Sequence, residues 1–131
     1  MKVIKFRYTI FSENPDRLAD FYTKVLKFKQ VVKVNRTGEY GYGIEACKGY
    51  KIWIAKHSEI TGRNKDPFRL ILSFYVDNIA DYFSAVKSEV HYTIIEEPNL
   101  TCVGIPNEER LVGSFLDTDG NCIQMMQMTG N

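Results

Sequence analysis

The sequence is poor in the residues on which metal sites and disulfide frameworks depend. Its 131 residues include only two histidines and three cysteines. The cysteines, Cys47, Cys102 and Cys122, are odd in number and never form a Cys-x-x-Cys pair. The sequence therefore encodes neither a disulfide framework nor a zinc site, and we expect all three thiols to be reduced.

Long apolar runs and an excess of charge are also missing. Seventeen basic and 16 acidic residues leave a net charge of +1, which disfavours nucleic acid and membrane surfaces as partners. No apolar run approaches the roughly 18 residues of a membrane span, and residues 1–7 alternate charged and apolar side chains, unlike a signal peptide. We expect a soluble, cytoplasmic protein.

The common motifs of nucleophilic catalysis and phosphate binding are absent as well. No Gly-x-Ser-x-Gly elbow occurs. Gly41 and Gly43 lie in an aromatic stretch without a following helix or lysine, so they are typical of strand glycines that allow bending or the close approach of a ligand rather than of a phosphate loop.

What the sequence does contain is an internal repeat. The segment Leu18–Val25 returns 61 positions later (79 − 18) as Ile79–Val86, with the same or a related residue at seven of the eight places. Aligning the two candidate helix caps, Asn14 and Asn78, gives an offset of 64 instead (78 − 14). We predict two copies of one unit, whose alignment is less certain than their common architecture.

Each copy has the pattern β-α-β-β-β and predicts an α+β fold. Period-two alternation predicts the strands, and Asn14 followed by Pro15, or Asp77 or Asn78, begins each amphipathic helix. In one domain, 1–131, we predict module one at 1–56, a linker at 57–67 and module two at 68–131. The predicted strands are 4–10, 28–34, 40–47 and 50–55, then 69–76, 91–95, 110–116 and 122–128, with a loop at 96–109.

Two phrases resemble the signatures of a known family. Asn14–Phe28, with Phe21-Tyr22 at its centre, and Phe115–Gln127, with Asp119-Gly120-Asn121, are similar to the two ends of vicinal oxygen chelate proteins, which include glyoxalase, bleomycin resistance proteins and extradiol dioxygenases. The resemblance implies two βαβββ modules that form an incomplete barrel around a central cavity. The chain departs from the family pattern at Asn14, Lys27, Thr118 and Gln124, where Asp, Gly, Pro and Glu are usual.

The resemblance also implies where a metal would be bound. The positions that carry ligands in metal-using relatives hold Arg7, Trp53, Ile71 and Gln124, of which only Gln124 could coordinate a metal. His57 and His91 fall at none of these positions. We expect no metal and no other cofactor, with a noncognate site near His57, Glu45 and Glu59 as the alternative.

These four positions favour a partly apolar or aromatic ligand with an anionic group, which Arg7 could grip and Trp53 could stack upon. An internal salt bridge of Arg7 to Glu45 or Asp117, and ordinary core packing of Trp53, are the alternatives. The predicted ligand-binding residues are Arg7, Thr9, Trp53, Ile71, Ser73, Tyr75, Gln124 and Met126, with Phe11 and Cys122 on the same face. The residues predicted to pack under the helices are Ile4, Phe6, Tyr8, Leu70, Leu72, Phe74, Ile123 and Met125.

Three functions are consistent with this pattern. The first is a metal-free small-molecule-binding protein that works as a homodimer. The second is a metal-dependent enzyme of the lyase or dioxygenase type. The third is an interaction module with a vestigial cavity. The loop at 96–109 could serve as a lid or as a dimer contact.

Overall fold

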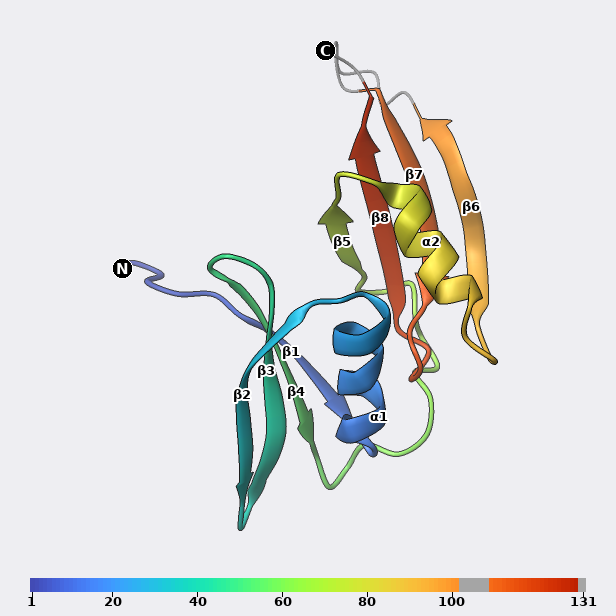
Figure 1. Ribbon diagram of the computed structural model, residues 1–131. Coiled ribbons are helices and arrows are strands. Elements are labelled where there is room, and N and C mark those ends of the chain that lie inside the picture. The colour runs from blue at the N-terminus through green and yellow to red at the C-terminus, as the bar shows by residue number, and fades with distance from the viewer. Residues whose placement is uncertain (102–108, 130–131) are drawn as a thin grey trace. The chain divides into compact units, whose positions relative to one another are not determined.

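The computed structural model describes residues 1–101 and 109–129, in two compact units that cover residues 1–62 and 63–131 (Figure 1). The boundary between the units falls inside the stretch 57–67. Each unit is one βαβββ module with its own four-stranded sheet.

Module one has the strand order β1-β4-β3-β2, and module two the equivalent order β5-β8-β7-β6. In each, the first strand runs parallel to its neighbour and the other pairs are antiparallel. The elements of module one are β1 (Tyr8–Ser12), α1 (Pro15–Asp20), a π-helical turn η1 (Phe21–Val25), β2 (Lys29–Arg36), β3 (Glu39–Cys47) and β4 (Tyr50–Lys56). Those of module two are β5 (Leu72–Tyr75), α2 (Ile79–Lys87), β6 (Thr93–Thr101), β7 (Arg110–Leu116) and β8 (Cys122–Met128).

The α+β class and the two βαβββ modules are confirmed. The two sheets share no strand and are not closed into a barrel, so the central cavity stays a prediction. Within the described ranges, no helix is long and apolar enough to cross a membrane.

Both predicted helix caps are present. The side chain of Asn14 accepts a hydrogen bond from the Arg17 N–H at 3.2 Å, and that of Asn78 accepts one from the Asp81 N–H at 3.3 Å. Each cap satisfies one backbone donor that the first helical turn would otherwise leave unpaired. The caps and the first residues of β1 and β5 are all 64 positions apart. The two modules are therefore aligned at an offset of 64. The similarity of Leu18–Val25 to Ile79–Val86, at an offset of 61, is displaced from this alignment by three residues.

One face of each sheet is covered by its own helix. In module two, Phe83 of α2 meets Phe115 of β7 edge to face, with ring centroids 5.3 Å apart. Ile123 and Met125 of β8 are fully buried, in agreement with their predicted place under the helix. In module one, the fully buried side chains include Leu18 and Tyr22 of the helix and Ile44 and Ile54 of the sheet.

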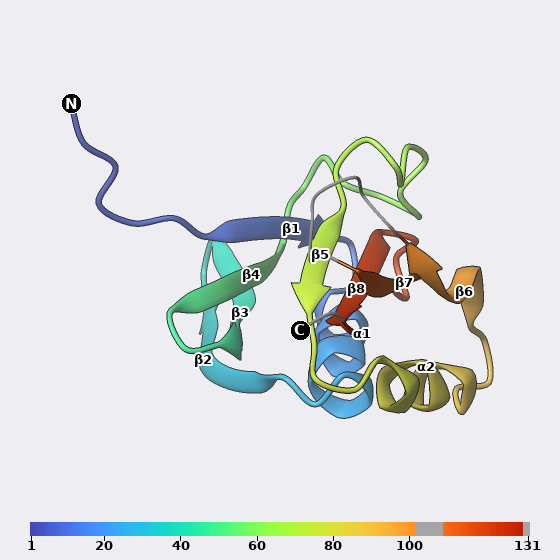
Figure 2. The ribbon, with the colours of Figure 1, turned by 90° about the horizontal axis from the view of Figure 1, so that it is seen from above.

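The first predicted strand was wrong at its start. Ile4 and Phe6 were expected in the core, but they precede β1 and are 89% and 76% exposed. Continuing the register of Tyr8 with Ile52 would set Ile4 opposite Lys48, which belongs to the turn between β3 and β4. The ladder has no partner there, so residues 1–7 extend beyond the sheet (Figure 2).

Strand β5 is shorter than the predicted 69–76 for the same kind of reason. Its register pairs Leu72 with Ile123, so Leu70 would lie opposite Asn121 in the turn before β8. The Asn121 N–H is already engaged, since it donates to Asp117 Oδ1 at 2.9 Å. Leu70, predicted to be core, is therefore 72% exposed, and Ile71 also precedes the strand.

The predicted loop at 96–109 was wrong in its first part, because β6 continues to Thr101. Pro98 is tolerated because β6 is an edge strand whose register is irregular between Glu96 and Asn99. The Asn99 side chain bridges the irregularity by donating to Glu96 Oε1 at 2.8 Å and to the Val112 carbonyl at 3.3 Å. Residues 102–108, the rest of the predicted lid, lie outside the described residues. The remaining strand boundaries agree with prediction to within two residues.

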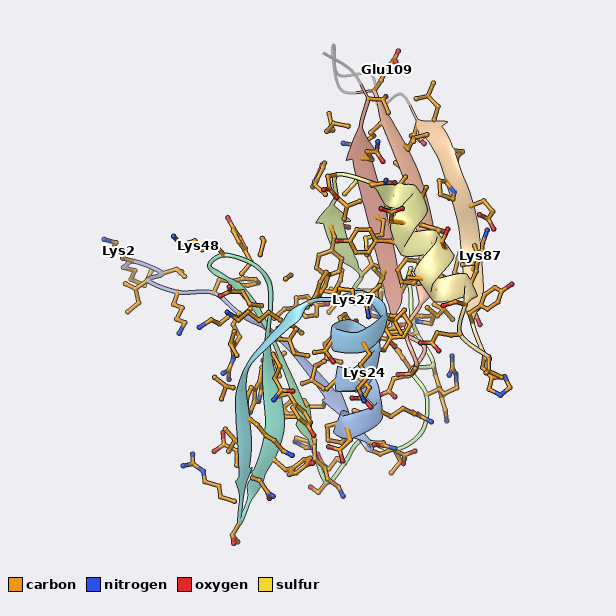
Figure 3. All side chains as sticks on the ribbon, viewed as in Figure 1. Lys2, Lys24, Lys27, Lys48, Lys87 and Glu109 are labelled. Carbon is orange, nitrogen blue, oxygen red and sulfur yellow. The ribbon has the colours of Figure 1, made fainter. Side chains whose placement is uncertain are left out.

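Lys27, at the end of the first helical segment (Figure 3), is the only described residue other than glycine with a positive φ, +62°. The chain reverses there, so that the Phe28 N–H donates to the Tyr22 carbonyl at 2.9 Å and the two rings meet at 6.2 Å. A Cβ makes this left-handed conformation costly, and the family has glycine at this position.

Replacing Lys27 by glycine should therefore raise the free energy of unfolding by about 1 kcal/mol, as measured by urea denaturation. Lys24→Gly, inside the π-helical turn with negative φ, is the control and should lower stability by about 1 kcal/mol. A loss of stability in Lys27→Gly would show that the lysine side chain contributes more than its backbone strain costs.

Candidate functional site

In module one, the helix-facing side of the sheet is identified by Tyr42. Its hydroxyl donates to Asp16 in the first turn of α1, as does that of Tyr40, and the two hydroxyls lie 3.2 Å apart. These hydrogen bonds, that from Tyr40 foremost, lower the pKa of the Asp16 carboxyl, and the same contact with Asp16 raises the pKa of Tyr42. The carboxylate thus holds α1 against β3.

Because side chains alternate along a strand, the neighbours of the helix-facing set point to the opposite, helix-free face of the sheet. Thr9, Trp53 and Gly43 are consecutive partners across β1, β4 and β3 on this face. Arg7 joins them from just before β1, with its guanidinium carbon 5.3 Å from the centre of the Trp53 ring. The structure thus brings three of the predicted ligand-binding residues together, Arg7, Thr9 and Trp53.

Arg7 is exposed and lies against an aromatic face rather than a carboxylate. Within the described part of module one no acidic side chain forms an ion pair with it, so the alternative salt bridge to Glu45 is not formed. Asp117, the other alternative partner of Arg7, accepts hydrogen bonds from Asp119 and Asn121 within its own turn. Trp53 is only 9% exposed, which makes it a platform for the guanidinium more than an open stacking surface.

His57 lies at the other end of this face and was not predicted to belong to it. Its ring meets that of Phe11 at 4.8 Å, and its Nδ1 accepts the Glu59 N–H at 3.1 Å. A neutral His57 therefore carries its proton on Nε2. The sequence could have predicted this place, because His57 follows Trp53 and Ala55 at intervals of two residues and so continues the same face just beyond β4.

In module two, the side away from α2 gathers four more predicted residues. Ser73 is paired with Gln124 across β5 and β8, and the Ser73 hydroxyl donates to Gln124 Oε1 at 3.2 Å. Tyr75 and Met126 form the next row, and Arg110 donates to the Tyr75 hydroxyl at 3.3 Å. This helix-free face is half polar and half apolar.

Cys122 shares the parity of Gln124 and Met126 in β8 and so lies on the same helix-free face, as predicted, whereas Ile71 lies outside its strand. Ile71 precedes β5 and is 38% exposed. Cys122 is buried at the start of β8, where burial, helped by the charge of Asp117, raises the pKa of its thiol.

The residues at the family's metal positions do not fit a metal ion. The Arg7 guanidinium remains a cation, and Trp53 and Ile71 offer no donor. The Gln124 Oε1 is already an acceptor for Ser73. Nowhere in residues 1–101 and 109–129 do three His, Cys, Asp or Glu side chains gather closely enough to hold a metal.

Comparison with solved structures finds the same fold in proteins of low sequence identity. The integron cassette protein VCH_CASS1 from the mobile metagenome of V. cholerae is 22% identical over 98% of both chains, with a TM-score of 0.68. The virulence protein STM3117 of Salmonella typhimurium is 19% identical over 98% of this chain and 100% of its own, with a TM-score of 0.69. The genomically encoded fosfomycin resistance protein FosX of Listeria monocytogenes is 13% identical over 100% and 94%, with a TM-score of 0.69.

Comparison with curated protein sequences gives no match. A family model does match, over residues 6–125, which is nearly the whole chain and includes both modules. The chain belongs to the glyoxalase/bleomycin resistance protein/dioxygenase superfamily.

Proposed function

We propose that this chain binds, without a metal, a small molecule that carries an anionic group on a partly apolar or aromatic body. The observation that carries the proposal is Arg7, a cation held over the Trp53 ring with no carboxylate of module one paired to it. A protein that needed Arg7 only for stability would be expected to neutralise it.

The cation–π contact of Arg7 with Trp53 suits anion recognition. The indole restrains the Arg7 side chain, and an aromatic ring accepts no hydrogen bonds from the guanidinium edge as a carboxylate would, so the N–H donors can serve a carboxylate or phosphate of the ligand. Thr9, beside Trp53 on the same face, offers a hydroxyl to the same ligand. Ser73, Tyr75, Gln124 and Met126 give module two the mixture of apolar surface and few polar groups that is typical of small-molecule sites.

The test uses the fact that Trp53 is the only tryptophan of the chain. Benzoate, an aromatic monoanion, serves as the probe; calorimetry measures its affinity, and tryptophan fluorescence reports where it binds. Arg7→Ala should weaken benzoate about tenfold, or about 1.4 kcal/mol, the usual value of a hydrogen bond to a charged group at an accessible site.

Arg36→Ala is the matched control, because it removes the same charge from an exposed hairpin position where Arg36 pairs with Glu39. It should leave the affinity unchanged. Equal affinities of Arg7→Ala and the unmodified protein would remove Arg7 from the site. Saturable binding that fails to change the Trp53 fluorescence would place the site elsewhere.

A further inference from the structure

The helix-free face of module one carries a row of charged residues, hereafter the charged row. It lies next to the row that contains Trp53, two residues away along each strand. Cross-strand pairing sets Lys29 of β2 opposite Glu45 of β3, and Glu45 opposite Lys51 of β4. Arg7 precedes the Tyr8–Ile52 pair by one position, which continues the row to β1. The charged row is thus Arg7, Lys51, Glu45 and Lys29. The sequence predicted Arg7 as a ligand-binding residue and Glu45 only as its alternative partner or as part of a noncognate metal site, and it singled out neither lysine.

The charges of this row do not cancel. Three cations and one anion leave two positive charges in excess, with the carboxylate placed between the two lysines. Yet neither lysine lies within 4.0 Å of the Glu45 carboxylate, since no ion pair among the described residues includes either one. Exposed pairs do form elsewhere in this module, as in Lys24 with Asp20 and Arg36 with Glu39.

The row lies close to the aromatic platform. Lys51 and Glu45 are each two residues from the Trp53–Gly43 pair along their strands, which is about 7 Å. Lys51, Lys29 and Arg7 are all exposed, so their charges are accessible to an anion. A ligand whose ring lies near Trp53 would set its acidic group among these cations.

We infer that the charged row is a subsite for a doubly charged anionic group, such as a phosphate monoester, on the ligand of the proposed function. The inference rests on that function and names the class of its ligand. A dianion placed among Arg7, Lys51 and Lys29 relieves the repulsion between the cations and gains from all three, whereas a monoanion is satisfied by Arg7 alone. The Glu45 carboxylate opposes the dianion and moderates its affinity.

The experiment compares two probes on the full chain, phenyl phosphate and benzoate. Above about pH 7, phenyl phosphate is mostly a dianion because the second pKa of a phosphate ester is about 6, while benzoate stays a monoanion. We expect phenyl phosphate to bind about tenfold more tightly, with an affinity that falls steeply as salt is added.

Two variants, one that removes a positive charge and one that removes the negative charge, test the role of the row. Lys51→Met should remove most of the preference for phenyl phosphate, and Glu45→Gln should increase it severalfold, a gain that loss of folding could not produce. Lys56→Met is the control, because Lys56 lies on the same strand but, by alternation, on the opposite face; both affinities should stay unchanged.

The outcomes separate the two proposals. Equal affinities for the two probes, or a preference for phosphate that survives Lys51→Met and ignores Glu45→Gln, would overturn the subsite and leave the proposed function standing. If neither probe binds, the proposed function fails and the subsite fails with it.

Discussion

Replacing Asp117 by alanine is expected to lower the free energy of unfolding by about 3 kcal/mol. Asp117 is only 3% exposed and lies in the turn between β7 and β8. Its Oδ1 accepts the N–H groups of Asp119 and Asn121, each at 2.9 Å, and its Oδ2 accepts the side-chain amide of Asn121, also at 2.9 Å. Alanine would leave both backbone donors in the turn without their acceptor.

The same turn fixes the beginning of module two. The Asn64 N–H donates to the Asp119 carbonyl at 2.8 Å, and the Arg63 guanidinium donates to the Thr118 carbonyl at 3.0 Å. Loosening the turn should therefore also release residues 63 and 64.

Denaturant unfolding measures the effect, and Asp117→Asn is the matched variant. It keeps one acceptor oxygen and should cost about 1 kcal/mol. A loss below about 1 kcal/mol in Asp117→Ala would show that water replaces the carboxylate.

Gly41→Ala should lower the free energy of unfolding by a comparable amount, about 3 kcal/mol, because the added methyl group would meet backbone atoms. A Cβ at Gly41 would lie 2.5 Å from the Ile54 carbonyl oxygen and 2.9 Å from the Ala55 Cα, in the neighbouring strand β4. No side-chain rotation can relieve these contacts, so the pairing of β3 with β4 must move.

Gly43→Ala is the control, two residues along the same strand and on the same face. Its Cβ would have side-chain atoms as its nearest neighbours, Val32 Cβ at 3.2 Å and Val31 Cγ2 at 3.8 Å, and it should cost about 1 kcal/mol or less. Equal stabilities of the two variants would mean that the strands adjust without cost. The sequence predicted bending or the close approach of a ligand at Gly41 and Gly43, whereas the close neighbour of Gly41 is the backbone of β4.

Local signals in the sequence predicted the local structure well. Asn14 with Pro15, and Asn78, mark helix starts through backbone hydrogen bonds that need no tertiary contact, and both caps are present. Alternation also placed Trp53, Ser73 and Gln124 correctly on the helix-free faces. The alternation of faces along a strand does not depend on where the strand begins or ends, so an error in the predicted ends does not change it.

Features that depend on a second strand were not predictable. Ile4 and Leu70 alternate like core residues, but their sheets end before them. The charged row depends on the register of β2 with β3, which a bulge near Val31 shifts by one residue. No local pattern encodes that bulge, so the place of Lys29 opposite Glu45 could not be predicted.

The family is shown, whereas the ligand, the absence of a metal, the homodimer and the cytoplasmic location stay predictions. Arg7, Trp53 and Ile71, at three of the four positions where metal-using relatives carry ligands, are the reason to expect binding without a metal.

The most direct test of metal-free binding is one calorimetric titration of benzoate into chelator-treated protein, repeated after a divalent metal is added. The account predicts saturable binding at one site per chain with the same affinity in both. Binding that appears only after the metal is added would contradict it.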